Sequence, residues 1–413
     1  MKLMVIATNL NRKELLKRWI LLKNRNKDID LTILTPIKYE VGASKGYTWG
    51  DVKVLEASEY KEERLEVIPI KVMQNRFGGW KSQEVIPIIK HIKPDVIYYI
   101  GIHASGFLSK ILKVAHSKKV GAKVYVFTMR GDLKPERPKS VKHKLIKLYR
   151  ALKEHYKYNV KNSDAIFVHY PDAVEAFREE GYKGPLFINT QIGVDTSYFK
   201  YTQEGRENIR KALGIEDCFV FGGVSRLNPE KGILDAIKAL PKNPKIKYMI
   251  LGSGTEQELR NIKQTAADYG IEDQIIMPGL IDWVELPNYL SAMDCAVHIP
   301  RRTSNWVETF SLALVQEMAV GLPVIGSRSG SVTYQIGNET LMVDEGDIEG
   351  IRKKMQLVID NKELTKQVGT KMRERTQNCF DVERLATCFD IVLDELNKGI
   401  YNIKHLDTAE RWD

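Results

Sequence analysis

The chain has 413 residues, of which 43% are hydrophobic and 28% are charged, with 63 basic residues against 53 acidic ones. This composition is ordinary for a folded globular protein, and it excludes a disordered, collagen-like or disulfide-stapled chain. At about 150 residues per domain, the length predicts two large domains or three small ones.

The first element expected is a strand over residues 3–7, because a short apolar run is followed at once by polar Thr8 and Asn9. This run is too short for the apolar region of a secretory signal. No apolar run reaches the roughly 18 residues that a membrane span requires. The four cysteines are far apart and lack metal-ligand spacing, which favours a reducing compartment and predicts no structural zinc. We therefore expect a cytoplasmic protein.

Short apolar strands alternate with amphipathic helices along nearly the whole chain, a pattern typical of doubly wound parallel sheets. The strands expected in the first half cover residues 3–7, 31–34, 96–100, 124–127 and 165–168. Those expected in the second half cover residues 218–224, 247–251, 275–277, 295–299 and 323–327. The sequence thus predicts an α/β protein with two Rossmann-like domains, whose ligand would bind at the carboxyl ends of the strands.

The join between the two domains is expected near residues 193–216, where a polar stretch separates the halves. We predict an N-terminal domain over residues 1–195 and a second domain over residues 196–378. A C-terminal helical segment, residues 379–413, could pack back on the N-terminal domain.

Positive charge is concentrated in residues 134–161, which contain ten basic and two acidic residues. Apolar residues recur in this segment every three or four positions, which predicts a basic amphipathic helix. Such a helix suits an anionic membrane surface, with candidate contacts at Lys142, Lys144, Lys147 and Arg150. It is equally typical of a surface helix packed on its own domain. Nucleic-acid binding is disfavoured because no RNP strand, zinc finger or helix-turn-helix pattern accompanies the charge.

A phosphate-binding motif is expected after the strand that ends at Val224. Arg226 lies at the carboxyl edge of that strand, and Asn228 and Pro229 are expected to open the next helix. Lys231 then falls in the first helical turn, where the helix dipole disfavours a cation, so an anion is expected beside it. Arg226 and Lys231 would together hold a diphosphate. Two solvated loop cations are the alternative.

A second motif runs from Glu308 to Gly321. A helix beginning near Ser311 would present free backbone N–H groups to a phosphate. From the apolar spacing we expect Gln316 to face the margin of the cleft and Glu317 to point away from it. Glu308 would accept hydrogen bonds from sugar hydroxyls. The alternative interpretation is that its negative charge only complements the dipole of the helix.

Glycines lie at the ends of several expected strands: Gly223 is near the end of one, and Gly254 follows another. None of these sites completes the GxGxxG pattern, so a dinucleotide-dependent oxidoreductase is poorly supported. His298, on an apolar segment, is expected to be buried with its hydrogen bonds satisfied. Asp28-Ile29-Asp30 matches a DxD metal motif, but it lies between a helix and a strand and is interpreted as ordinary surface.

As a set, these motifs resemble the donor domain of the retaining glycosyltransferases of GT-B fold, specifically family 4. The likeness rests on the arginine-to-glycine stretch, two strand-and-glycine segments and the glutamate-to-valine block, at residues 226–232, 251–254, 277–280 and 308–324. The first half is similar to the family's acceptor domain more loosely, through residues 93–96, 163–165 and 192–195.

The resemblance implies two Rossmann-like domains that face each other across a cleft. It implies transfer of a sugar from a nucleotide diphosphate sugar to an acceptor hydroxyl, with retained anomeric configuration and no required metal or other cofactor. Arg226 and Lys231 would stabilise the departing diphosphate, and Glu308 would hold the donor sugar. The remaining donor contacts that it implies are Gly223, Gly254, Met277, Pro278, Gly279, Leu280, Thr309, Phe310, Ser311 and Gln316.

The chain departs from the family pattern on both sides of the site. Gln316 stands where the family has the glutamate that holds the ribose, so either a neutral amide binds the ribose or the helix shifts. Arg130 stands where the family has a sugar-contacting histidine, and it could instead meet phosphate or an acidic acceptor. The candidates for the acceptor or sugar side are Asn9, His103 and Arg130.

We therefore expect a glycosyltransferase that acts on a lipid-linked saccharide or glycolipid in cell-surface polysaccharide or glycan synthesis. Its expected place is the cytoplasm, peripherally on the inner face of the membrane. Two alternatives remain open on the same fold. One is an enzyme of another class, a nucleotide-sugar epimerase or a phosphorylase, and the other is a non-catalytic sugar-nucleotide-binding protein.

Overall fold

The computed structural model describes residues 1–8, 10, 13–40, 54–56, 60–62, 64–74, 80–101, 105–128, 155–304 and 306–400. The chain divides into two compact units: unit 1 consists of Met1–Gln191 and Leu385–Asp413, and unit 2 of Ile192–Arg384. The chain leaves unit 1 a few residues before the boundary expected at 195, and it returns a few residues after the boundary expected at 378. The C-terminal helix therefore belongs to unit 1.

A doubly wound sheet forms the centre of unit 1. Its described strands follow the order β12-β11-β10-β9-β1-β2-β6-β5, and the neighbouring strands are parallel except for the pair of β5 and β6. The order reverses between β1 and β9, as expected for this fold class. The strand bounds are β1 (Lys2–Ile6), β2 (Asp30–Pro36), β5 (Tyr60–Glu62), β6 (Leu65–Ile70), β9 (Val96–Ile100), β10 (Lys123–Phe127), β11 (Ala165–Val168) and β12 (Leu186–Ile188). Two small hairpins add β3 (Lys38–Glu40) with β4 (Val54–Glu56), and β7 (Met73–Gln74) with β8 (Trp80–Lys81).

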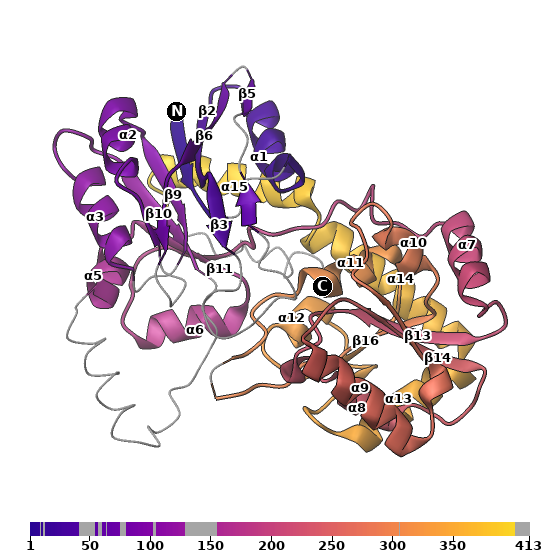
Figure 1. The fold of residues 1–413 in the computed structure, drawn as a ribbon. Coiled ribbons are helices and arrows are strands. Elements are labelled where there is room, and N and C mark those ends of the chain that lie inside the picture. Colours follow the sequence, from indigo (N-terminus) through magenta and orange to yellow (C-terminus); the bar gives the residue numbers. More distant parts are fainter. Residues whose placement is uncertain are drawn as a thin grey trace, which may run out of the picture. The chain divides into compact units, whose positions relative to one another are not determined.

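Helices cover both faces of this sheet (Figure 1). Side chains of α1 and α15 pack on one face, and those of α2 and α3 pack on the other. Because both faces are covered, β9 is buried at every position, which explains its unbroken apolar sequence. The helix bounds are α1 (Lys13–Arg25), α2 (Val85–Ile92), α3 (Gly106–Ala115), α5 (His155–Asn162), α6 (Pro171–Glu179) and α15 (Val382–Asn397). None of the helices in the described part of the chain combines the length and apolar character needed to cross a membrane.

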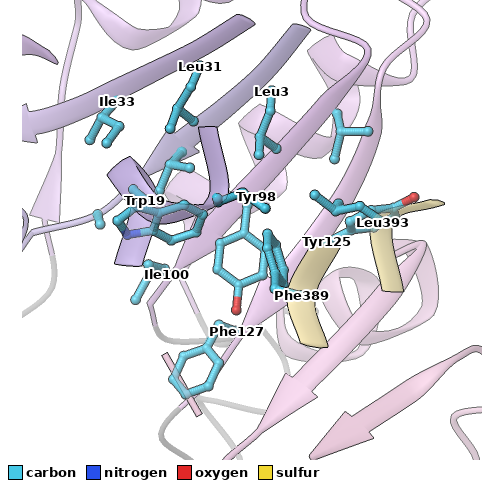
Figure 2. Close-up of a cluster of buried hydrophobic side chains, with 14 of the residues drawn as sticks. Leu3, Trp19, Leu31, Ile33, Tyr98, Ile100, Tyr125, Phe127, Phe389 and Leu393 are labelled. Atoms are coloured by element: carbon cyan, nitrogen blue, oxygen red, sulfur yellow. The ribbon is translucent and has the colours of Figure 1, made fainter. Parts of the chain in front are cut away.

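The C-terminal helix α15 is part of the core of unit 1. Figure 2 shows Phe389 and Leu393 among buried side chains of the sheet and of α1. The ring of Phe389 lies 4.8 Å from the ring of Tyr98 and 5.6 Å from that of Trp19, measured between centroids. Phe389 is fully buried, so a segment remote in sequence completes the first hydrophobic core.

Unit 2 contains a parallel sheet whose described strands follow the order β15-β14-β13-β16-β17-β18. The order reverses between β13 and β16. The strand bounds are β13 (Phe219–Val224), β14 (Ile246–Leu251), β15 (Ile275–Gly279), β16 (Cys295–His298), β17 (Val324–Ser327) and β18 (Met342–Val343). The ten strands expected from the sequence are all found, and their ends differ from the predicted ends by at most two residues.

The helices of unit 2 begin and end at clear sequence signals. Thr255 and Glu258 form a capping box at the start of α9, and Gly270 ends that helix in a left-handed conformation. The bounds are α7 (Gln203–Leu213), α8 (Ile233–Ala239), α9 (Glu256–Tyr269), α10 (Leu286–Ser291), α11 (Leu312–Val320), α12 (Val332–Ile336), α13 (Ile348–Asp360) and α14 (Lys362–Cys379). Two short 3₁₀ helices are η1 (Pro229–Lys231) and η2 (Glu272–Gln274).

The packing of α15 can be tested by truncating its central ring. Phe389→Ala is expected to lower the free energy of unfolding by about 3–5 kcal/mol, because a fully buried aromatic ring is replaced by a cavity. Urea unfolding measures the loss. Ile400→Ala, a truncation at a C-terminal side chain that is 47% exposed, should change stability by no more than about 0.5 kcal/mol. Similar effects of the two changes would contradict the assignment of α15 to the core.

Candidate functional site

Two adjacent parallel strands of unit 2, β13 and β16, carry the candidate site at their carboxyl ends. The strands pair directly, and the strand order of the sheet reverses between them. The segment after β13 contains Arg226 and Lys231, and the segment after β16 contains Glu308. Ligands of doubly wound sheets bind where the strand order reverses, so the topology places these three residues where binding is expected.

Lys231 is the last residue of η1, a single 3₁₀ turn opened by Asn228 and Pro229. Gly232 follows with φ 73°, and a Cβ there would overlap the carbonyl oxygen of Ile299. Lys231 thus lies in the helical turn that Asn228 and Pro229 open, as expected, but the left-handed Gly232 separates this turn from α8, so the expected continuous helix is broken. Lys231 directly precedes Gly232, the N-cap of α8, and its contacts show which anion balances its charge.

Lys231 and Glu308 form a buried ion pair. The ammonium of Lys231 donates to Glu308 Oε2 at 2.5 Å, and the two side chains are only 10% and 8% exposed. The carbonyl oxygen of Glu308 also accepts a hydrogen bond of 2.8 Å from the N–H of Ser331. Losing one partner of such a pair leaves an unpaired buried charge, which typically costs about 3–5 kcal/mol. The pair therefore ties the segment after β13 to the segment after β16.

An aromatic ring completes the surroundings of Lys231. The ammonium lies 4.7 Å from the ring centroid of Trp306, a distance typical of a cation–π contact. Trp306 is half-buried, two residues before Glu308. The sequence analysis missed this residue. The available signal in the sequence was a tryptophan in a mostly polar stretch, two residues before the glutamate.

The helix α11 begins as the sequence predicts, with Ser311 as its N-cap. The hydroxyl of Ser311 accepts a hydrogen bond from the N–H of Leu314 at 3.3 Å. The side-chain amide of Gln335 bonds both the N–H and the C=O of Ser311, at 2.9 and 3.0 Å. Phe310 packs 5.8 Å from the ring of Phe380, and Thr309 is half-buried. These bonds fix the start of α11 beside Glu308.

Glu317 lies against β13, and the expectation that it points away from the site is wrong. Its Oε1 accepts a hydrogen bond of 2.9 Å from the N–H of Val224, at the end of β13. The helix α11 packs against β13, α10 and α14 and is buried from Leu314 to Val320, so it has no single buried stripe.

Gln316 is also buried, at 3% exposure, rather than at an open margin. Its Nε2 has no hydrogen-bond partner among the described residues. A buried amide donor without an acceptor normally carries a free-energy cost, which a ligand oxygen would remove. The role of Gln316 toward a ribose stays a prediction.

A small cavity lies beside Lys231, lined by Gly223, Ser225, Lys231, Tyr248 and His298 among others. His298 is buried as expected, but its Nε2 has no hydrogen-bond partner in the described part of the structure, so the expectation of satisfied bonds is wrong. Its Nδ1 lies 3.6 Å from Glu317 Oε2.

Burial sets the charges of these two groups. Desolvation lowers the pKa of His298 to about 4 and raises the pKa of Glu317 to about 8, although the nearby Lys231 opposes the second shift. At pH 7 both groups are therefore mainly neutral, and they face each other as a neutral pair. The net charge of the cluster then comes from Lys231, Glu308 and neighbouring Arg226.

Packing within unit 2 accounts for two of the candidate glycines. A Cβ at Gly223 would lie 3.0 Å from the carbonyl oxygen of Val297 in the neighbouring strand, and a Cβ at Gly254 would lie 2.7 Å from the Cβ of Leu227. A side chain at Gly254 would thus displace its neighbours and one at Gly223 would be tightly packed, so the fold favours glycine at both positions without a ligand.

The segment expected to receive the base of a nucleotide lies at the carboxyl end of β15. Met277, Pro278 and Gly279 are the last residues of this strand, and Leu280 follows with 75% of its side chain exposed. The strand β15 is at the edge of the sheet and is separated from β13 by β14.

The acceptor-side and membrane-contact candidates lie outside the described residues. These are Asn9, His103, Arg130, Lys142, Lys144, Lys147 and Arg150. Their roles stay predictions. From the basic segment 134–161 the structure describes only residues 155–161, which belong to α5.

The motifs at this site can be compared with known families. Residues 205–375 match the family model of the glycosyl transferases group 1. The matched span lies within unit 2 and includes Arg226, Lys231, Glu308 and Gln316.

Relatives with related names match in sequence. The chain is 30% identical to a GDP-mannose-dependent alpha-(1-6)-phosphatidylinositol monomannoside mannosyltransferase of Mycolicibacterium smegmatis. The aligned region has 168 residues and covers 38% of this chain and 43% of that protein. It is 23% identical to the capsular polysaccharide biosynthesis glycosyltransferase CapM of Staphylococcus aureus, over 84% of this chain and 87% of CapM. The chain spans about half the length of the first curated relatives that it matches.

Solved structures match over both units. HepE of Anabaena in complex with UDP has a TM-score of 0.68 and 16% identity, covering 96% of this chain and 100% of HepE. Sucrose-phosphate synthase of Thermosynechococcus elongatus has a TM-score of 0.69 and 17% identity, covering 97% and 100%. The chain has the two-domain α/β fold of GT-B glycosyltransferases.

The raised pKa of Glu317 predicts a pH dependence of stability. Between pH 4.5 and about 8 the unfolded chain releases this proton while the folded protein keeps it, so stability falls as the pH rises. Glu317→Gln removes the effect. Relative to the unchanged protein, its free energy of unfolding should therefore rise by about 1 kcal/mol per pH unit between pH 6 and 8.

Urea unfolding at pH 6, 7 and 8 measures this difference. The control is Glu256→Gln, which changes a carboxylate that is 89% exposed. The difference in free energy of unfolding between Glu317→Gln and Glu256→Gln should grow as the pH rises. Parallel pH profiles would show that Glu317 is already ionised in the folded protein.

Proposed function

We propose that the protein is a retaining glycosyltransferase that moves a sugar from a nucleoside diphosphate sugar to an acceptor hydroxyl. The observation that carries this proposal is the buried pair of Lys231 and Glu308 where the strand order of unit 2 reverses. The match of residues 205–375 to the glycosyl transferases group 1 supports it. The names of the matched relatives do not favour the epimerase, phosphorylase or binding-protein alternatives.

In this proposal the donor diphosphate replaces Glu308 as the partner of Lys231. The diphosphate brings more negative charge than one carboxylate, so the exchange leaves the buried ammonium better neutralised. Arg226, at the carboxyl end of β13, supplies a second cation with a bidentate fork. As the bond between the sugar and the diphosphate breaks, both cations stabilise the growing negative charge on the leaving group. Because side chains provide this charge, we propose that the reaction requires no metal.

The exchange also releases the carboxylate of Glu308 to the sugar. A carboxylate accepts hydrogen bonds from sugar hydroxyls, and Ser331 holds the backbone of Glu308 in place. Gln316 donates its unpartnered Nε2–H to a hydroxyl of the ribose. The end of β15, residues 277–280, receives the base.

The acceptor in this proposal is a lipid-linked saccharide or glycolipid. Two matched relatives are named for phosphatidylinositol mannosides and for capsular polysaccharide. The excess of basic residues in segment 134–161 suits the anionic inner surface of a membrane. The protein would then work in the cytoplasm, bound peripherally at that surface.

Donor binding can be tested with a thermal-shift panel of UDP, GDP, ADP and their sugars in EDTA. One nucleotide class is expected to stabilise the protein, by about 2.7 kcal/mol at 100 times its dissociation constant. Lys231→Ala should abolish the shift because it removes the cation that holds the diphosphate. Lys238→Ala, in α8 of the same unit, serves as the matched control and should retain it. The donor proposal fails if none of these nucleotides stabilises the unchanged protein.

The stereochemistry can be read from slow transfer of the sugar to water. With an α-linked donor, NMR recorded before mutarotation should show the α-anomer of the free sugar. EDTA should leave the rate within about twofold, since Lys231 and Arg226 supply the charge. Initial release of the β-anomer would overturn retention, and loss of activity in EDTA that Mg²⁺ restores would overturn metal independence.

A further inference from the structure

Trp306 is a large aromatic residue beside the ion pair that the proposed reaction leaves without a role. Its ring centroid lies 4.7 Å from the Lys231 ammonium, which is itself 2.5 Å from Glu308 Oε2. The ring therefore contacts the cation that would hold the diphosphate, and that same cation pairs with the carboxylate that would hold the sugar.

The segment that carries Trp306 is anchored at its start and closed on itself. The N–H of Arg301 donates to the carbonyl oxygen of Glu230 at 2.7 Å, and its guanidinium pairs with Asp235 of α8. The N–H of Thr303 donates to the carbonyl oxygen of Trp306 at 2.8 Å, which ties the backbone of Trp306 to the start of the segment. The position of the ring beside Lys231 thus follows from the fold of this segment.

The exposure of Trp306 differs from that of its neighbours. Val307 and Glu308 are buried, whereas Arg302, Thr303 and Ser304 are exposed. Trp306 lies between these classes, so its side chain is only partly removed from solvent. An indole left partly in water forgoes some of the free energy of burial, and a bound ligand would recover it.

A sugar attached to a diphosphate has the chemistry that fits this arrangement. A pyranose ring presents hydroxyls at its edge and C–H groups on its faces. A carboxylate binds the hydroxyls, and an aromatic ring packs against the C–H groups, a combination typical of small-molecule sites. Because the sugar is bonded directly to the phosphate, a diphosphate on Lys231 would bring the sugar next to Trp306.

We propose that Trp306 is a specificity-determining residue, which forms the apolar wall against which the transferred sugar packs. This inference rests on the proposed function, and it distinguishes the sugar from the nucleotide. Trp306 should contribute to the affinity for the nucleotide sugar and little to the affinity for the nucleoside diphosphate alone.

The test measures dissociation constants by calorimetry for UDP against UDP-glucose and for GDP against GDP-mannose. For the pair that binds the unchanged protein, Trp306→Ala should weaken the nucleotide sugar about tenfold and the free diphosphate less than about threefold. Trp306→Phe keeps an aromatic face and should restore most of the affinity. Tyr269→Ala, at the exposed end of α9, is the control for loss of an aromatic ring elsewhere in unit 2.

The other possible results of this test lead to different conclusions. Equal weakening of both ligands would show that Trp306 acts only through Lys231 and would overturn the inference, as would no weakening of either. Thermal unfolding without ligand identifies a variant that fails to fold, in which case Trp306→Phe decides. If neither pair binds the folded, unchanged protein, ADP and ADP-glucose are measured in the same way, and the proposed function itself fails if these do not bind either.

Discussion

The buried ion pair of Lys231 and Glu308 is the interaction on which the candidate site depends. It joins two segments that follow neighbouring strands, and its two charges are almost entirely removed from water. A buried pair of this kind gives little net stability, because desolvation of both ions offsets their attraction. Its value in this protein is geometric, since it holds a cation and a carboxylate ready at the carboxyl edge of the sheet. In the proposed reaction, the single contact between the two ions is replaced by two contacts with the donor. The diphosphate binds Lys231, and the sugar hydroxyls bind Glu308.

Two buried groups near the pair, His298 and Glu317, add little charge of their own. Burial leaves His298 and Glu317 mainly neutral near pH 7, so neither competes strongly with Glu308 for Lys231. Glu317 instead uses one oxygen to accept a backbone hydrogen bond from Val224 and so fixes the end of β13. With His298 and Glu317 neutral, the remaining charges are those of the Lys231–Glu308 pair and of Arg226 in the same segment. In the proposed exchange both cations would meet the departing diphosphate.

Much of the fold follows from the sequence, because buried parallel strands are continuous apolar runs and α/β units repeat them. The site is less predictable. The break between the turn of Lys231 and α8 was not expected, because the sequence does not show that Gly232 adopts a left-handed conformation against Ile299. Glu317 was assigned to the wrong side because periodicity assumes one buried face, whereas α11 is enclosed by β13, α10 and α14. Trp306 escaped because only three-dimensional folding brings its ring to Lys231. Strands β6 and β18 were not expected, since β6 contains Pro69 and β18 has only two residues.

The most direct test of the central claim is an experimental structure of the protein bound to UDP-glucose or GDP-mannose, whichever stabilises it. The account predicts the diphosphate on Lys231 and Arg226, with Glu308 turned to the hydroxyls of the sugar. An intact pair of Lys231 and Glu308, with the nucleotide bound elsewhere, would contradict it.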